Sequence, residues 1–329
     1  MRTKYKLPLL LSFLCLAGLN GQCQSPAAKS ANTASADPVF ESLQYKFPAK
    51  KMMLSNGQSV AYVDEGKGKE TIVFIHGLGS YLPAWEKNIS ELKSNYRTIA
   101  LDLPGYGKSS KENVQVSMEG YAKTVLELMD KLEIKKATLA GHSMGGQIAI
   151  TAALQAPERV KSLILAAPAG LETFTEQQKQ LFKMTVTPES IQASTPEQVA
   201  ANYKSNFYIM PADAQHMVDE RLQMMKSEQF DDYSKAVAGS VAAMVNEPVY
   251  EKLPQLNVPT LIVFGEQDAL IPNKYLNPTL TTKNVAAVGK ERIQNSQVIL
   301  IPEAGHFLQF EQPEAFNKAV HDFLKKSAK

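Results

Sequence analysis

Two kinds of segment alternate along the chain beyond about residue 50, and this alternation limits the fold more than any other feature. Runs rich in β-branched and aromatic residues predict a hairpin at 51–64 around Asn56-Gly57 and strands at 71–75, 96–101, 137–140, 160–166, 260–264 and 298–301. Apolar residues at helical spacing predict helices at 81–92, 118–132, 144–155 and 313–325. Strands that alternate with helices form βαβ units. We therefore expect an α/β fold with a mostly parallel twisted sheet and helices on both faces.

One long region interrupts the alternation. Residues 171–252 contain no convincing strand and are rich in Gln, Glu, Met and Ala, so we interpret them as a helical cap inserted over the active edge of the sheet. The region carries many flexible or aromatic apolar side chains: Met184, Met210, Met217, Met224, Met225, Met244, Phe174, Phe182, Phe207 and Tyr208. We expect most of them to fill the cap's own core and some to face the site, because a cap over a cleft presents one apolar surface to it.

Composition and charge exclude some classes of partner. The chain has 329 residues, of which 44% are hydrophobic and 21% charged, as in ordinary globular proteins. Its formal charge is +2, but residues 1–23 hold three basic and no acidic side chains. The remainder therefore has 32 basic against 33 acidic groups, or −1. This balance gives no reason to expect nucleic acid or an anionic membrane surface as a partner, and it predicts no oligomeric state.

The N-terminus has the pattern of an export signal. Three basic residues precede an apolar run at 7–19 that is too short to span a bilayer comfortably, and the chain turns polar after Cys23. We expect residues 1–23 to be a signal peptide, residues 24–45 to be a flexible polar linker and residues 46–329 to be the folded domain.

Two forms of export fit this pattern. Cleavage after Gly21 or Cys23 would release a soluble protein, secreted or periplasmic, whereas lipidation of Cys23 would tether a lipoprotein to a membrane. Gln22 stands where lipoprotein signals usually have a small residue, so soluble export is favoured. The other cysteine, Cys15, lies within the predicted signal, and the mature domain therefore has no internal disulfide. The chain has no Cys/His cluster with metal-ligand spacing, and we expect neither a metal nor a cofactor.

A candidate nucleophile lies between a predicted strand and a predicted helix. Residues 141–145 read Gly-His-Ser-Met-Gly, a G-x-S-x-G pattern in which Ser143 would project from a sharp strand-to-helix turn. Glycines two residues on either side allow neighbouring backbone to approach closely. The strand–turn–helix context makes a nucleophilic role for Ser143 a better interpretation than a serine in an ordinary Gly-rich turn.

A serine nucleophile requires a base, and the chain has five histidines. His306 lies in Gly305-His306-Phe307 just after the last predicted strand, on a loop that would reach the serine. We interpret the other four as structural, surface or core residues: His76, His142, His216 and His321.

The third member of a triad holds the imidazole in the right tautomer and stabilises its charged form. Asp268 follows the predicted strand 260–264, at the edge where open α/β sheets bind ligands. Glu266 is closer to the strand end and fits a turn better. Asp102 also follows a strand, but it precedes the serine in the chain.

Four motifs together resemble the α/β-hydrolase superfamily, in particular its capped esterase and lipase branch with secreted bacterial lipases. They are His-Gly-Leu-Gly at 76–79, Asp-Leu-Pro-Gly-Tyr-Gly-Lys-Ser at 102–109, Gly-His-Ser-Met-Gly-Gly at 141–146 and Gly-His-Phe at 305–307. The family's order of serine, acid and histidine agrees with Ser143, Asp268 and His306. The resemblance implies an oxyanion hole made by the backbone N–H groups of Leu78 and Met144, with His76 as a brace for its loop. For this family, residues 277–297 are unusually long and polar, and we assign them no function.

The resemblance narrows the reaction. Epoxide hydrolases and haloalkane dehalogenases of this fold have aspartate where Ser143 stands, and proline iminopeptidases usually have tryptophan where Met144 stands. We expect a hydrolase of carboxylic esters, with a small apolar ester of short to medium acyl chain as its substrate. Carbon–carbon bond hydrolases and acyltransferases with the same triad are the alternatives. A non-catalytic binding protein is disfavoured because all three triad residues are present.

Overall fold

The computed structural model describes residues 37–327. The predicted signal peptide, Cys23 and residues 24–36 of the predicted linker lie outside the described residues. Within 37–327, no helix is both long and apolar enough to cross a membrane.

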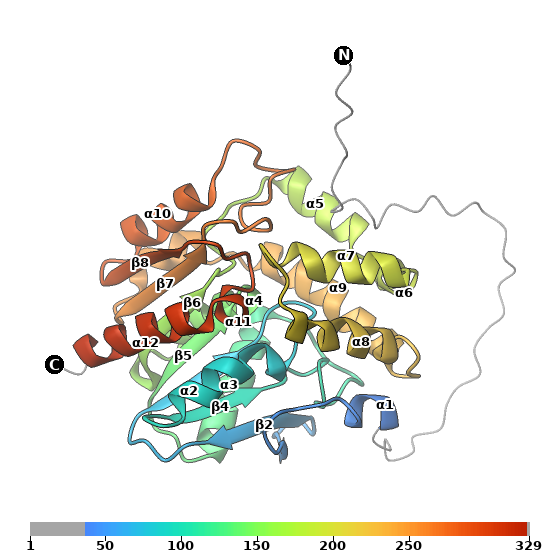
Figure 1. Cartoon of the computed structure of the whole chain (residues 1–329), viewed down its shortest axis with the longest axis horizontal. Coiled ribbons are helices and arrows are strands. Elements are labelled where there is room, and N and C mark those ends of the chain that lie inside the picture. Colours follow the sequence, from blue (N-terminus) through green and yellow to red (C-terminus); the bar gives the residue numbers. More distant parts are fainter. Residues whose placement is uncertain (1–36, 328–329) are drawn as a thin grey trace, which may run out of the picture.

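One sheet, at the centre of Figure 1, contains all eight strands of the described chain, in the order β1-β2-β4-β3-β5-β6-β7-β8. β1 and β2 are antiparallel to their neighbours, and the other strands pair in parallel. The strands are β1 (Lys50–Met53), β2 (Ser59–Glu65), β3 (Thr71–Ile75), β4 (Arg97–Leu101), β5 (Ala137–His142), β6 (Val160–Ala166), β7 (Thr260–Gly265) and β8 (Ser296–Ile301). The predicted α/β fold class is confirmed.

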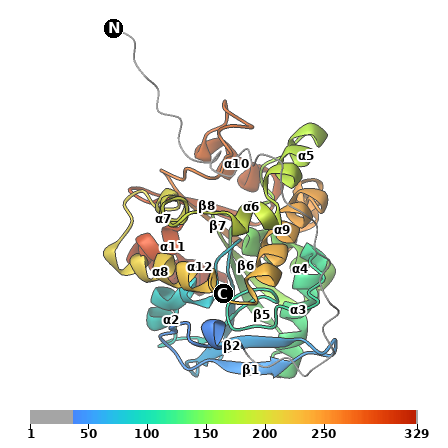
Figure 2. The same ribbon diagram turned by 90° about the vertical axis from the view of Figure 1, so that its right-hand side faces the viewer.

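Helices cover both faces of the sheet. Figure 2 shows α2 (Glu86–Leu92) and α12 (Pro313–Ser327) on one side of the strands, and α3 (Met118–Lys131) and α4 (Met144–Gln155) on the other. Local sequence sets their ends. For example, Ser117 accepts a hydrogen bond from the N–H of Gly120 (2.8 Å) and caps α3. Shorter elements lie next to these helices: η1 (Leu82–Trp85) and α11 (Leu308–Glu311) beside α2, and η2 (Pro157–Arg159) beside α4.

The helical insertion lies between β6 and β7, and its helices gather at the right of Figure 1. It consists of α5 (Glu176–Thr185), α6 (Pro188–Gln192), α7 (Pro196–Ser205), η3 (Ala212–Ala214), α8 (Gln215–Met224), α9 (Phe230–Asn246) and η4 (Tyr250–Gln255). Its methionines differ in environment. Met217 and Met224 are buried in the cap, whereas Met184 is 76% exposed.

The last part of the predicted linker is folded, which corrects the expectation for residues 24–45. Asp37 caps α1 (Pro38–Glu41), accepting a hydrogen bond from the N–H of Val39 (2.8 Å), and Phe40 and Leu43 are buried. The polar composition of 24–36 masked the apolar residues that follow, and these pack on the domain because burial offsets the entropy of ordering them.

The polar stretch 277–297 also has an ordinary explanation. It contains α10 (Thr282–Arg292), which connects the parallel strands β7 and β8. Thr281 and Asn284 form a capping box at its start, and Val285 and Ala286 face the interior. A parallel pair requires such a crossover, and the few apolar positions in α10 hid its periodicity.

Candidate active site

Ser143 lies on a strained turn between β5 and α4. Its φ of +53° and ψ of −117° are uncommon for a residue with a side chain. Glycine is required on either side, because a Cβ on Gly141 would lie 2.1 Å from the Gly145 carbonyl oxygen. A Cβ on Gly145 would lie 2.2 Å from the carbonyl oxygen of Ile75. The turn therefore holds Ser143 half-buried at the N-terminus of α4, as the G-x-S-x-G pattern requires.

Asp268 and His306 meet across two loops. Asp268 follows β7 and is 1% exposed, and His306 follows β8 and is 4% exposed. The Nδ1 of His306 lies 2.9 Å from Asp268 Oδ2, while Asp268 Oδ1 accepts the N–H groups of Leu270 (2.8 Å) and Ile271 (3.0 Å). This arrangement fixes the imidazole with its Nδ1 proton toward the acid and leaves Nε2 available as a base. Among residues 37–327, no hydrogen bond joins His306 to Ser143 Oγ.

The loop after β3 approaches the same turn. A Cβ on Gly77 would lie 3.2 Å from the Cβ of Ser143, so Gly77 and Leu78 pass close to the serine. Within the described chain, no acceptor binds the N–H of Leu78. Met144 is the first residue of α4, and its N–H therefore has no acceptor within the helix. Both N–H groups are free to bind a negatively charged oxygen.

His142 supports His306, a role that the sequence did not predict. Its Nε2 lies 3.0 Å from the His306 carbonyl oxygen, and the centroids of the two rings are 4.8 Å apart. Burial lowers the pKa of His142 well below its ordinary value, and the nearby His306 lowers it further. His142 is therefore neutral, and its Nε2–H donates to the backbone carbonyl of His306.

The remaining histidines have structural surroundings. His76 accepts the N–H of Leu103 at Nε2 (3.0 Å) and donates from Nδ1 to the Gly77 carbonyl (2.8 Å). Burial lowers its pKa to about 4, so it is uncharged at neutral pH. His216 bonds to a carbonyl in the cap, and His321 lies against the ring of Tyr96.

Glu311 connects the loop that carries His306 to the cap, and no pattern in the sequence indicated this contact. Its carboxylate accepts three backbone N–H groups: Gly305 (2.7 Å), Tyr208 (3.1 Å) and Ile209 (2.6 Å). Two of the donors belong to the cap and one directly precedes His306. Glu311 thus joins the cap to the loop that carries His306.

The two rival acids lie in other environments. Glu266 is exposed. Asp102 is fully buried, but its oxygens bind the Tyr45 hydroxyl (2.5 Å) and the N–H groups of Leu82 (2.7 Å) and Lys108 (2.8 Å). Neither carboxylate contacts His306. The described residues also contain no group of three or more His, Cys, Asp or Glu side chains arranged to hold a metal ion.

The site combines a strained serine, an aspartate paired with a histidine at the same sheet edge, and two free backbone N–H groups beside the serine. A sequence model of the alpha/beta hydrolase fold matches residues 70–313. The chain belongs to the alpha/beta hydrolase family. It is a hydrolase of this superfamily.

The proteins to which this chain is similar are named for different activities, as three of them show. Over 263 residues the chain is 34% identical to the dihydrolipoyllysine-residue acetyltransferase component of the acetoin cleaving system of Pseudomonas putida. That match covers 79% of this chain and 65% of the relative, so the chain spans just under two thirds of that protein's length. It is 30% identical to a 2-hydroxy-6-oxononadienedioate/2-hydroxy-6-oxononatrienedioate hydrolase of the same species, over 81% of this chain and 92% of the relative. A thermophilic esterase from Thermogutta terrifontis superposes with a TM-score of 0.68 and 25% identity, over 85% of this chain and 99% of the esterase.

Proposed function

We propose that this alpha/beta hydrolase cleaves carboxylic esters through an acyl-enzyme, with Ser143 as nucleophile, His306 as base and Asp268 as the acid that orients it. The observation that carries the proposal is the 2.9 Å contact between His306 Nδ1 and Asp268 Oδ2, on the sheet edge that also presents Ser143. Similarity to the Thermogutta terrifontis esterase supports the ester substrate.

The reaction proceeds in two halves. Ser143 Oγ attacks the acyl carbon while His306 Nε2 takes its proton, and the N–H groups of Leu78 and Met144 stabilise the oxyanion. The C–O bond to the alcohol then breaks, and the alcohol leaves with the proton held by His306. Water repeats the sequence on the acyl-enzyme: His306 takes its proton, the carboxylic acid forms and Ser143 is restored. Asp268 stays ionised throughout and stabilises the imidazolium.

Covalent labelling tests the nucleophile. In a fluorophosphonate reaction, Ser143 Oγ should displace fluoride from phosphorus, and peptide mapping should place the adduct on Ser143 alone. Ser143→Ala should abolish labelling and leave the fold unchanged by circular dichroism. An adduct on another serine, or none on active protein, would refute the assignment.

The acyl pocket is the second part of the proposal. The cap is rich in methionine and aromatic side chains, and each methylene group buried against such a surface contributes about 0.8 kcal/mol. We expect kcat/KM for nitrophenyl esters to rise from acetyl to hexanoyl by several-fold per added pair of methylenes, and by about 15-fold where both groups are fully buried, because two groups contribute about 1.6 kcal/mol. A flat or falling series would show that these side chains only pack the cap's interior.

One observation favours a second candidate, a carbon–carbon bond hydrolase. Arg221 of α8 is half-buried beside the loop at 77–80, its Nε has no hydrogen-bond partner, and no carboxylate in residues 37–327 forms an ion pair with it. A guanidinium binds carboxylates well. The Pseudomonas putida relative is named for dienedioate substrates, which carry two carboxylates.

A comparison of kcat/KM for two substrates separates the two candidate functions. Turnover of a 2-hydroxy-6-oxo-dienedioate, followed by loss of its absorbance, should be at least about 100-fold lower in kcat/KM than turnover of a neutral hexanoyl ester if the enzyme is an esterase. The reverse ranking, with Arg221→Gln raising KM for the dienedioate only, would establish the second candidate.

Export is a further proposal that rests on residues 1–23. Mass spectrometry of the protein recovered from its own cells should find a mature N-terminus after Gly21 or Cys23. A diacylglyceryl group on Cys23 would instead establish a lipoprotein, and an intact N-terminus would refute export.

A further inference from the structure

The loop that carries the Leu78 N–H is a tight turn. Ser80 donates its N–H to the Gly77 carbonyl (3.2 Å), and Gly79 has a φ of +66°, which places Leu78 and Gly79 at the centre of the turn. These bonds leave the Leu78 N–H unused, so its direction depends on whatever holds the turn in place. The carbonyl of Gly79, two peptide groups further along the chain, is the part of the turn that Arg221 and Tyr233 of the cap contact.

Two cap side chains hold that carbonyl. Arg221 donates from Nη2 to the Gly79 oxygen (2.5 Å), and Tyr233 of α9 donates its hydroxyl to the same oxygen (3.3 Å). The guanidinium also lies 4.7 Å from the centroid of the Tyr233 ring. A charged donor makes the stronger of the two bonds. We propose that Arg221 is a positioning residue, which keeps the Leu78 N–H directed at the oxyanion by holding the Gly79 carbonyl.

The preceding residue fastens α8 to the core. Glu220 is 5% exposed and accepts two hydrogen bonds, from the Tyr81 hydroxyl at Oε2 and from the Gln44 N–H at Oε1 (2.5 Å). Tyr81 directly follows the turn at 77–80, which we call the oxyanion turn. The Glu220 carboxylate therefore joins α8, this turn and the segment around Gln44, which is far away in the sequence. A buried carboxylate requires both partners, because an unpaired buried charge is strongly destabilising.

That distant segment, residues 37–47, forms an N-terminal strap. It contacts the cap where Asp37 Oδ2 accepts the Ser227 hydroxyl (2.7 Å) and where the Phe40 ring lies against Tyr233, with centroids 6.1 Å apart. The family match begins at residue 70, so the strap, like β1 and β2, lies outside the matched residues.

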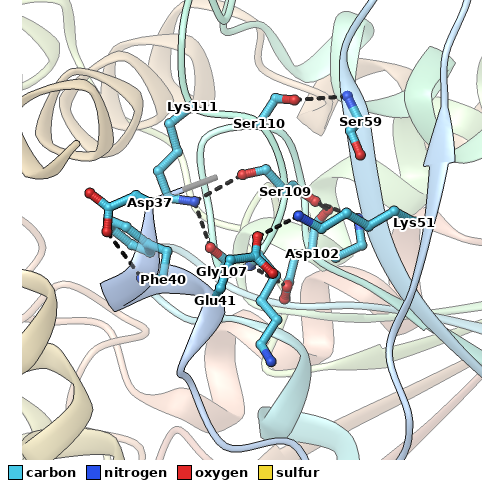
Figure 3. Close-up of polar contacts among 12 residues, drawn as sticks. Asp37, Phe40, Glu41, Lys51, Ser59, Asp102, Gly107, Ser109, Ser110 and Lys111 are labelled. Carbon is cyan, nitrogen blue, oxygen red and sulfur yellow. Dashed lines mark hydrogen bonds and ion pairs between the residues drawn. The ribbon is translucent and has the colours of Figure 1, made fainter. Parts of the chain in front are cut away.

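The strap is equally well attached to the core. Figure 3 shows Lys111 beside Phe40, where its amine lies 3.8 Å from the ring centroid and donates to the carbonyls of Gly107 (2.6 Å) and Ser109 (2.8 Å). Tyr45 binds Asp102 in the same cluster. The strap thus joins α8 to the core, and through Glu220 and Arg221 it supports the geometry of the oxyanion turn at 77–80.

This inference rests on the proposed function, and its test uses the full-length protein. We compare the rate of fluorophosphonate inactivation, kcat and KM for a hexanoyl ester in Arg221→Gln, Arg221→Lys and Glu220→Gln. Complete loss of one oxyanion donor costs about 100- to 1,000-fold in kcat, and a displaced donor costs less. We expect Arg221→Gln to lower kcat and the inactivation rate about 10- to 30-fold with KM within about threefold, and Arg221→Lys to recover about half of that loss on a logarithmic scale.

Glu247→Gln is the matched control. Glu247 follows α9 and accepts the N–H of Glu119 (3.0 Å), so it also ties the cap to the core, but away from the turn. We expect Glu220→Gln to lower kcat about three- to tenfold and Glu247→Gln to change it less than about twofold. Equal losses in both variants would show that loosening the cap explains the effect. Tyr233→Phe, with an expected loss of about twofold to threefold, tests the same carbonyl if Arg221→Gln fails to fold.

Other outcomes separate the two hypotheses. If fluorophosphonate did not label the wild-type protein, the proposed function would be refuted and the inference with it. A labelled wild type with unchanged kcat and inactivation rate in Arg221→Gln would refute the inference alone. A rise in KM confined to substrates with a carboxylate would show that Arg221 binds substrate, and it would equally overturn the positioning role.

Discussion

Asp102 and Asp268 are two aspartates in similar places with different neighbours. Each follows a strand, β4 or β7, and each is at most 1% exposed. Asp102 binds the Tyr45 hydroxyl and two backbone N–H groups, so all its partners are fixed parts of the fold. Asp268 also accepts two backbone N–H groups, but its second oxygen faces the imidazole of His306.

The difference shows what turns a buried carboxylate into a candidate for catalysis. Burial raises the pKa of Asp102, and its hydrogen bonds with Tyr45, Leu82 and Lys108 lower it. None of these donors exchanges a proton at neutral pH, so Asp102 braces the loop after β4. Asp268 instead contacts an imidazole, the side chain that general acid–base catalysis uses most often. Changes at the two sites should therefore affect different measurements.

The largest effect is expected at Asp268. Asp268→Asn should lower kcat for a hexanoyl ester by about 10⁴, because an amide favours the wrong tautomer of His306. The fold should persist, since an amide oxygen can still accept the N–H groups of Leu270 and Ile271. Steady-state kinetics and circular dichroism measure both. A loss below about tenfold would remove Asp268 from the proposed triad.

Asp102→Asn should act on stability. An amide in place of the carboxylate leaves three converging donors with fewer acceptors, at a cost of about 2–4 kcal/mol in the free energy of unfolding. Its kcat should stay within about tenfold of wild type when the protein is folded. Urea unfolding and kinetics on the same preparation test this, and a loss of kcat that exceeds that of Asp268→Asn would exchange the two roles.

His76, which braces the same loop as Asp102, predicts a pH dependence. Its pKa in the folded protein is about 4, below the ordinary value of 6.5. Between these values the unfolded chain binds a proton that the folded protein does not. The free energy of unfolding therefore falls as the pH falls from 6.5 to 4, by about 2–3 kcal/mol. Urea unfolding at pH 7 and pH 4.5 should show a smaller fall in His76→Asn, whereas equal falls would contradict a neutral His76.

Glu266→Gln should have the smallest effect. Its side chain is exposed after β7, so kcat should change less than about twofold and the free energy of unfolding by less than about 0.5 kcal/mol. The same assays apply. A larger loss of kcat would mean that the acid after β7 had been assigned to the wrong residue.

Local patterns in the sequence determined most of the fold. α4 was predicted with the bounds that the structure has, and Ser117 caps α3, because strand runs, caps and glycine turns depend on residues only a few positions apart. The strand–turn–helix context of Ser143 could be predicted for the same reason. One local prediction was wrong, for the last part of the linker, and no helix was predicted within 277–297. In both places polar composition concealed a few buried apolar residues.

Contacts between distant residues were decided only by the tertiary structure. The partners of Asp102, the support of His306 by His142, and the ties made by Glu311 and Glu220 have no signature in a linear pattern. Glu220 and Gln44 are 176 positions apart, and their hydrogen bond depends on where α8 and the strap come to lie. A single sequence specifies such pairs only through the packing of the whole chain, because a carboxylate binds whichever donors the fold brings to it. The sequence by itself therefore determined the elements and the candidate nucleophile, and the fold decided which charged groups surround them.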